Sequence, residues 1–209
     1  MNNQYTNISA SAEIKDTQGI LTGMYVNSTS SGTIKFNDGL SSTASVGVNA
    51  TGVLTGTDVF TDGETVTIGN KVYTMVDALT HTANQIKIGT LAVTLDNLKL
   101  AINGGAGAGT LFSYGTDAHT QVTATTNTDT AQTVAAIVSG TGPNAYATTE
   151  TASDVSWGAL VLEGGVAVNT LMNNTITPAI GYHDLGGSNF SNGLYATIAN
   201  TLDVTLYYQ

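Results

Sequence analysis

The stretch between about residue 50 and residue 165 differs in character from the chain on either side of it. Residues 1–49 and 166–209 consist of short alternating apolar and polar segments separated by Gly-, Asn-, Asp- and Ser-rich turns. An isolated set of two or three strands is marginally stable in water, so neither outer piece is expected to form a core alone. Together they supply about six strands, enough for a small sandwich or barrel. The sequence therefore predicts a mainly β protein in which a small β-sandwich or barrel domain is split by an inserted α+β domain.

The outer pieces show the two-residue period of half-buried strands. A strand is predicted where apolar and polar residues alternate over residues 8–15, and a turn where Ser, Thr and Gly gather at residues 27–32. A second turn, at residues 199–201, is expected to join a terminal hairpin, and residues 181–187 are expected to form a loop. The other predicted strands are residues 20–27, 33–36, 168–176, 194–198 and 202–207.

The middle stretch, residues 50–165, contains the one helix that the sequence predicts. Residues 94–103 place Leu95, Leu98 and Ile102 on one face, and Gly104-Gly105 follows as a terminator. Thr94 is predicted to be the N-cap, with Asp96 in the first turn. The Gly69-Asn70 pair predicts a tight hairpin between residues 64–68 and 71–76. Further strands are expected at residues 85–88, 120–125, 130–138 and 157–162.

Charge limits the classes of partner. The formal net charge is −10, with five lysines and no arginine, and the inserted stretch holds ten of the fifteen acids and three of the lysines. Binding to nucleic acid or to an anionic membrane depends on Lys and Arg, so neither partner is expected. With no cysteine, disulfides and thiolate metal sites are excluded. The opening residues lack the features of a secretory signal, and no apolar run is long enough to span a bilayer.

No motif predicts catalysis, a cofactor or a metal. The glycines at residues 104–109 follow a predicted helix, whereas a phosphate-binding loop precedes one. The histidines His81, His119 and His183 are scattered, without the spacing of a zinc site. Acidic residues near residue 60 match no calcium-binding loop, and no Gly-x-Ser-x-Gly elbow is present. We therefore expect a protein that is not an enzyme and binds no cofactor or metal.

Residues 12–27, 32–39, 190–198 and 203–208, under half of the chain, resemble the capsid decoration (cement) proteins and head-fibre bases of tailed bacteriophages. The inserted stretch is similar to a module that recurs in phage structural and tail proteins. The resemblance implies a homotrimer on the virion surface that assembles in the host cytoplasm, binds the major capsid protein and stabilises the head. Residues 1–49 and 166–209 would then bind the capsid and trimerise, and residues 50–165 would project.

For this role, the apolar and aromatic side chains of the outer strands are the candidate subunit or capsid contacts. The alternative function is a head-fibre or tail adhesin that binds a host-surface glycan or receptor through the inserted domain, with Tyr114 and Trp157 as its candidate surface. A lone Trp at the start of a strand is also typical of a core anchor. The candidate contacts are Ile14, Met24, Tyr25, Phe36, Phe190, Leu194, Tyr195, Tyr207 and Tyr208.

Overall fold

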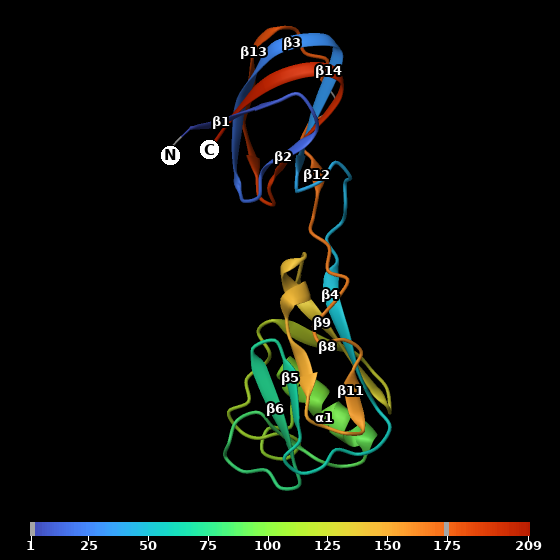
Figure 1. Cartoon of the computed structure of the whole chain (residues 1–209). Coiled ribbons are helices and arrows are strands. Elements are labelled where there is room, and N and C mark those ends of the chain that lie inside the picture. Colours follow the sequence, from blue (N-terminus) through green and yellow to red (C-terminus); the bar gives the residue numbers. More distant parts are fainter. Residues whose placement is uncertain (1–2, 174–175) are drawn as a thin grey trace. The chain divides into compact units, whose positions relative to one another are not determined.

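The structure of the protein is a computed structural model that describes residues 3–173 and 176–209 (Figure 1). It is mainly β with a single α-helix in the described residues, so the mainly β part of the predicted fold class is confirmed. The chain divides into two compact units. The split unit comprises the described residues up to Gly47 together with those from Ala167 onward, and the insert unit is Val48–Val166. The sequence placed these boundaries a residue or two away.

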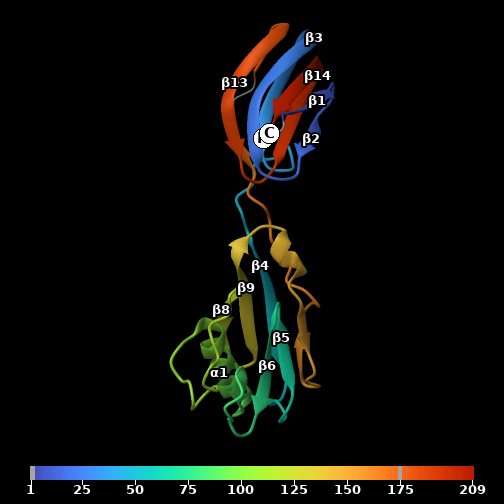
Figure 2. The same ribbon diagram turned by 90° about the vertical axis from the view of Figure 1, so that its left-hand side faces the viewer.

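Two long antiparallel strands form the centre of the split unit (Figure 2). β3 (Gly19–Asp38) pairs with β14 (Leu194–Tyr208) along nearly its whole length, from Leu21 opposite Tyr208 to Asp38 opposite Leu194. The shorter strands add to this ladder on both sides: β1 and β2 pair with β14, and β12 and β13 pair with β3. They are β1 (Gln4–Ile8), β2 (Ala12–Lys15), β12 (Thr170–Leu171) and β13 (Gly181–Phe190).

The turns predicted at residues 27–32 and 199–201 are wrong, because both segments lie inside continuous strands and the first of them contains a β-bulge. Ser31 and Asn200 adopt positive φ angles of 55° and 61°, and Thr201 pairs with both Ser30 and Ser31. Asn and Ser at positive φ serve a bulge as well as a turn. The extra residue of this bulge is in β3, and the two strands stay paired on either side of it. The turn signals in the sequence are therefore real, but they do not reverse the chain.

Other predicted elements of the split unit also differ. The predicted strand over residues 8–15 is interrupted between β1 and β2, and the predicted loop over residues 181–187 belongs to β13. Gly186 and Gly187 take φ angles of 68° and 70° at a register shift in that strand. The strand predicted at residues 168–176 is reduced to β12 and two isolated bridges, from Asn169 to Ser45 and from Ile176 to Ile34, while residues 174–175 lie outside the described residues.

The core of the split unit comes from alternate residues of β3 and β14. Side chains that point inward are apolar and almost fully buried, while their neighbours in sequence point outward. This core is continuous through the long ladder and closed by β1, β13 and the start of β14. Its members are Ile8, Leu21, Met24, Val26, Ile34, Phe36, Phe190, Leu194, Ala196, Leu202, Val204 and Leu206.

The insert unit contains two four-stranded sheets and α1 (Leu91–Asn103). One sheet has the order β10-β5-β6-β7 and the other the order β11-β4-β9-β8. The predicted hairpin is confirmed, with Gly69 at a φ of 54° between β5 and β6. The strands are β4 (Asn49–Gly56), β5 (Thr65–Ile68), β6 (Lys71–Val76), β7 (Gln85–Lys87), β8 (Val122–Asn127), β9 (Ala131–Ser139), β10 (Thr148–Glu150) and β11 (Val155–Trp157), with a 3₁₀ turn at Gly142–Ala145.

The helix begins one turn earlier than predicted. Thr90 is the N-cap, and its side chain accepts a hydrogen bond from the backbone N–H of Val93. Thr94 is instead buried, and its hydroxyl donates to the carbonyl of Thr90 and accepts from the N–H of Gly89. Two threonines four residues apart offer the same local signal, and packing decides which one caps. The predicted terminator is confirmed, since Gly104 is left-handed with a φ of 65°.

The insert unit begins and ends at hydrogen-bonded neighbours. Val48 and Val166 exchange two backbone hydrogen bonds of 2.9 and 3.0 Å. Within the split unit, Ser45 and Asn169 do the same at 2.9 and 3.1 Å. The chain therefore leaves and re-enters the split unit at adjacent points, which is the condition under which an insertion is tolerated.

Replacing residues 48–166 with a short Gly/Ser linker should leave a folded split unit, because its apolar core comes from its own strands. Circular dichroism should show a β spectrum with a cooperative thermal transition, and the proton–nitrogen NMR spectrum should be well dispersed. The isolated insert, residues 48–166, is the matched control and should fold as well. An unfolded linker variant would show that the insert is integral to the split unit.

Candidate binding surface

Four tyrosines lie on the outer face of the split unit's sheet, where β1, β14, β3 and β13 are neighbours. Tyr5 is paired with Tyr207, and Tyr25 with Tyr182. Residues paired directly across an antiparallel ladder point to the same side of the sheet. Tyr5, Tyr182 and Tyr25 expose 74%, 60% and 42% of their surface, so this is the most aromatic exposed area of the split unit. We call it the tyrosine face.

Gly23 provides the space in which one of these rings lies. It is the β3 residue opposite Tyr207, and a Cβ atom there would stand 2.5 Å from the Tyr182 hydroxyl and 2.9 Å from its ring carbon Cζ. The Tyr182 side chain therefore extends from β13 across the backbone of β3. Its ring centroid is 6.2 Å from that of Tyr207, with the ring planes tilted by 54°. The ring is held along the sheet and remains exposed.

A hydrogen-bonded polar cluster borders the tyrosines. Asp203 Oδ1 accepts from the side-chain amides of Asn7 at 2.8 Å and Asn27 at 3.2 Å. The same two amides donate to Thr205 Oγ1 at 3.3 and 3.2 Å. These four residues come from β1, β14 and β3, so the cluster ties three strands together on the outer face. Their orientation is fixed before any ligand arrives.

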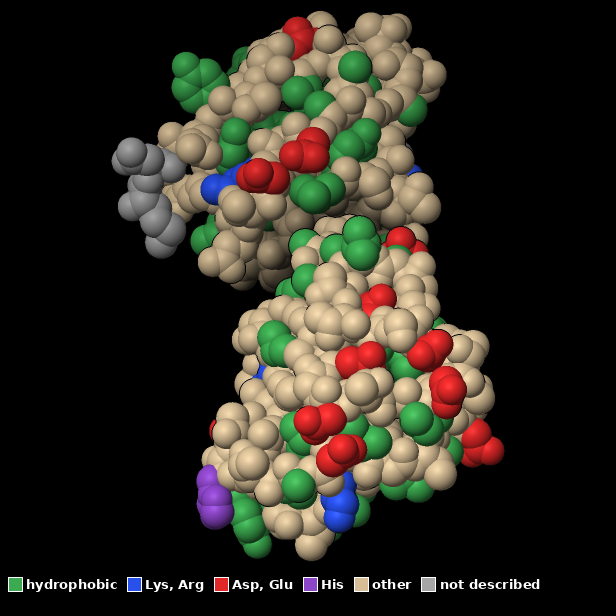
Figure 3. All heavy atoms as spheres, turned by 60° about the horizontal axis from the view of Figure 1, so that its bottom comes forward, with side chains coloured by type: hydrophobic (Ala, Val, Ile, Leu, Met, Phe, Trp, Pro, Cys, Tyr) green, Lys and Arg blue, Asp and Glu red, His purple; other side chains and the backbone are tan. Residues whose placement is uncertain are grey.

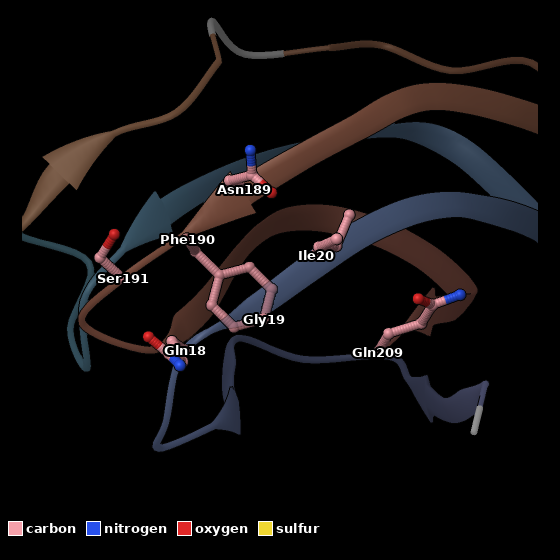
Figure 4. A pocket seen from close by; sticks show the side chains of 7 residues that line it. All are labelled: Gln18, Gly19, Ile20, Asn189, Phe190, Ser191 and Gln209. Carbon is pink, nitrogen blue, oxygen red and sulfur yellow. The ribbon is translucent and has the colours of Figure 1, made fainter. Parts of the chain in front are cut away.

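A hollow of about 410 Å³ lies at the end of β13, where β3 begins (Figure 4). Phe190 forms part of its wall, with its ring against Gly19, and Gln209 pairs through its backbone with Ile20. Apart from the Phe190 and Ile20 side chains, the lining is amide and hydroxyl. The lining residues are Gln18, Gly19, Ile20, Asn189, Phe190, Ser191 and Gln209, none of them charged.

The chain matches no protein-family model, no curated protein and no solved structure. No helix in the described part of the chain combines the length and the apolar character needed to cross a membrane.

The structure corrects the predicted set of contact residues. Five of them, Met24, Phe36, Phe190, Leu194 and Tyr208, are buried within the split unit, so their side chains stabilise its own fold. The predicted residues that retain exposed surface are Ile14, Tyr25, Tyr195 and Tyr207. Large apolar residues were selected by type, whereas the side of the strand decides which of them are accessible.

Two exposed tyrosines of the tyrosine face, Tyr5 and Tyr182, were missed. Tyr5 precedes the first predicted strand, and Tyr182 falls in the predicted loop. One signal could have found part of this surface: Tyr-x-Asn occurs at residues 5–7 and again at 25–27. On a strand this spacing places both side chains on one face.

Of the two candidate surface aromatics of the insert unit, one is buried and the other is exposed. Trp157 is 9% exposed and belongs to the insert's core, so its place in a binding surface is corrected to that of a core anchor. Tyr114 remains 63% exposed. Acidic side chains outnumber basic ones on the face of the insert unit that Figure 3 presents.

The His119 side chain is part of the insert unit's internal structure, where it makes hydrogen bonds to backbone groups. It is buried, its Nδ1 accepts from the backbone N–H groups of Gln121 at 3.0 Å and Val122 at 3.3 Å, and Nε2 lies 2.8 Å from the carbonyl of Ile68. These partners require a neutral ring with its proton on Nε2. Burial lowers the pKa of His119, the nearby Lys71 lowers it further, and the Ile68 carbonyl opposes the shift. Across residues 3–173 and 176–209, no three His, Cys, Asp or Glu side chains are placed to hold a metal ion.

The insert unit should lose stability in mild acid through His119. Its pKa is lowered in the folded state, so this contribution is fully present above the unfolded value of about 6.5 and is lost as the pH falls through the folded value. Trp157, the only tryptophan, lies in the insert's core and reports unfolding of that unit by fluorescence. The melting temperature of the insert unit should therefore fall as the pH is lowered from about 7.5 to about 5.

The variant His119→Asn should flatten this pH dependence, because the titrating group is gone while a side-chain acceptor remains. His81→Asn, at an exposed histidine of the same unit, is the matched control and should retain the wild-type profile. An unchanged slope in His119→Asn would assign the acid sensitivity to other groups.

Proposed function

We propose that the protein is a capsid decoration protein of a tailed bacteriophage, which binds the major capsid protein through its split unit and associates as a homotrimer. The observation that carries this proposal is a unit built from both outer parts of the chain, with strand edges that are open to a partner. In the described residues, β1 pairs only with β14, and β13 only with β3. Each therefore presents one row of backbone N–H and C=O groups to its surroundings.

Strand edges suit a protein with few charges. The split unit has five acidic residues and two lysines, so ion pairs offer little specificity for a partner. Backbone hydrogen bonds formed by adding a strand to an edge supply affinity without charge. The uncharged hollow at the end of β13 supplies side-chain amides and hydroxyls next to that edge.

A trimer would strengthen binding to a repeating lattice. When three linked copies face three equivalent sites, each binding event after the first is intramolecular, which raises overall affinity without new contacts. Modest contacts on each copy would then hold the protein on a capsid. The insert unit, with ten acids and three lysines, would give the particle a negatively charged decoration.

The alternative function, an adhesin that binds through the insert unit, has less support. One of its two candidate aromatics, Trp157, is a core residue, and Tyr114 is the one that remains exposed.

The purified protein should sediment with capsids assembled from its cognate major capsid protein, and light scattering should give three times the 21.4 kDa chain mass. The substitution Asn189→Lys places a charge at both the β13 edge and the hollow, and it should weaken capsid binding by about tenfold or more. The same substitution at the exposed Asn70 of the insert unit should leave binding unchanged. A monomer that stays in the supernatant would refute the proposal.

A further inference from the structure

The tyrosine face is not used by the strand-edge contacts proposed above, and its chemistry is distinct from theirs. It combines exposed rings with a fixed cluster of amide, hydroxyl and carboxylate groups on one rigid sheet. We propose that the tyrosine face of the split unit is a binding site for a neutral oligosaccharide. The proposal goes beyond capsid binding and does not depend on it.

The rings provide a stacking platform. Sugar rings have apolar faces of C–H groups, and these pack favourably on the electron-rich face of an aromatic ring. Tyr182 lies across β3 at Gly23 and stays 60% exposed, so one side of its ring is supported while much of its surface remains open to a ligand. Tyr5 and Tyr207 are paired on adjacent strands, about 4.8 Å apart, a spacing close to the length of one sugar residue.

The polar cluster provides the directional contacts. Asn7 and Asn27 both donate to Oδ1 of Asp203, which leaves Oδ2 to accept from ligand hydroxyl groups. A carboxylate is a strong acceptor for such donors. Because the cluster is already hydrogen-bonded across three strands, binding costs little side-chain ordering.

Size and charge favour this ligand over other classes. Four strands and the distance from Asp203 to Tyr207 define an area of about 200 Å², whereas a stable protein interface takes about 800 Å² from each partner. The tyrosine face includes the carboxylates of Asp203 and, opposite Gly23, of Asp184, and no lysine. Two carboxylates disfavour a sialylated or uronic-acid glycan and a nucleic acid. A short neutral oligosaccharide fits both limits.

The experiment uses the whole 209-residue chain. An array of defined glycans selects the sugar class, and calorimetric titrations with cellohexaose, xylohexaose, mannohexaose and the anionic control sialyllactose follow. We expect saturable binding to at least one neutral hexasaccharide and none to sialyllactose. Tyr182→Ala should weaken binding by about tenfold or more, because it removes a stacked ring.

Further variants separate stacking from other effects. Gly23→Ala should also weaken binding, since the new Cβ displaces the Tyr182 ring, while Tyr182→Phe should retain most of the affinity. Tyr114→Ala, which removes an equally exposed tyrosine from the insert unit, is the matched control and should bind like wild type. Thermal melts followed by circular dichroism verify that each variant is folded.

Three results would overturn the proposal: no neutral oligosaccharide binding at millimolar concentration, binding that survives Tyr182→Ala, or a tyrosine face that holds a protein. The last would appear as loss of the trimer or of capsid sedimentation in Tyr182→Ala. Asn189→Lys tests the capsid proposal on a different surface, so failure of one proposal is distinguishable from failure of the other.

Discussion

The pairing of β3 with β14 is the interaction on which the rest of the split unit depends. It joins residues 19–38 to residues 194–208, and the flanking strands attach to one or the other member of this pair. Closing so long a loop costs entropy, but that cost grows only with the logarithm of loop length. An insert of more than one hundred residues is therefore affordable, provided that its ends meet. The hydrogen bonds between Val48 and Val166 show that they do.

The continuity of this ladder also creates the tyrosine face. Side chains alternate strictly along a strand, so residues keep to one side only while the strand continues. If the chain had turned at residues 27–32, Tyr25 and Asn27 would stand at the end of a hairpin instead of on a four-stranded surface. The bulges of β3, such as the one where Ser30 and Ser31 both oppose Thr201, let the strand continue, so Tyr25 stays paired with Thr205 on one side and Tyr182 on the other.

These bulges mark the limit of what the sequence could predict. Apolar alternation correctly indicated a mainly β protein, and Gly69-Asn70 and Gly104 correctly marked a hairpin and a helix end. A Ser or Asn at positive φ has the same local preference in a turn and in a bulge, and only the partner strand, more than 150 residues away, decides between them. The candidate contacts failed for a related reason. Residue type alone placed Phe36 and Leu194 at an interface, whereas their position on the inner side of the sheet makes them core.

The two proposed binding functions use perpendicular directions of one sheet. Backbone N–H and C=O groups at the edges of β1 and β13 point along the plane of the sheet, whereas the tyrosines stand above it. A partner strand at an edge and a sugar on the face would therefore not compete for the same groups. Tyr182 and Asn189 lie on opposite sides of the register shift in β13, and replacing the Tyr182 side chain removes no backbone group from the edge. This geometry is why Tyr182→Ala and Asn189→Lys can test the two functions independently.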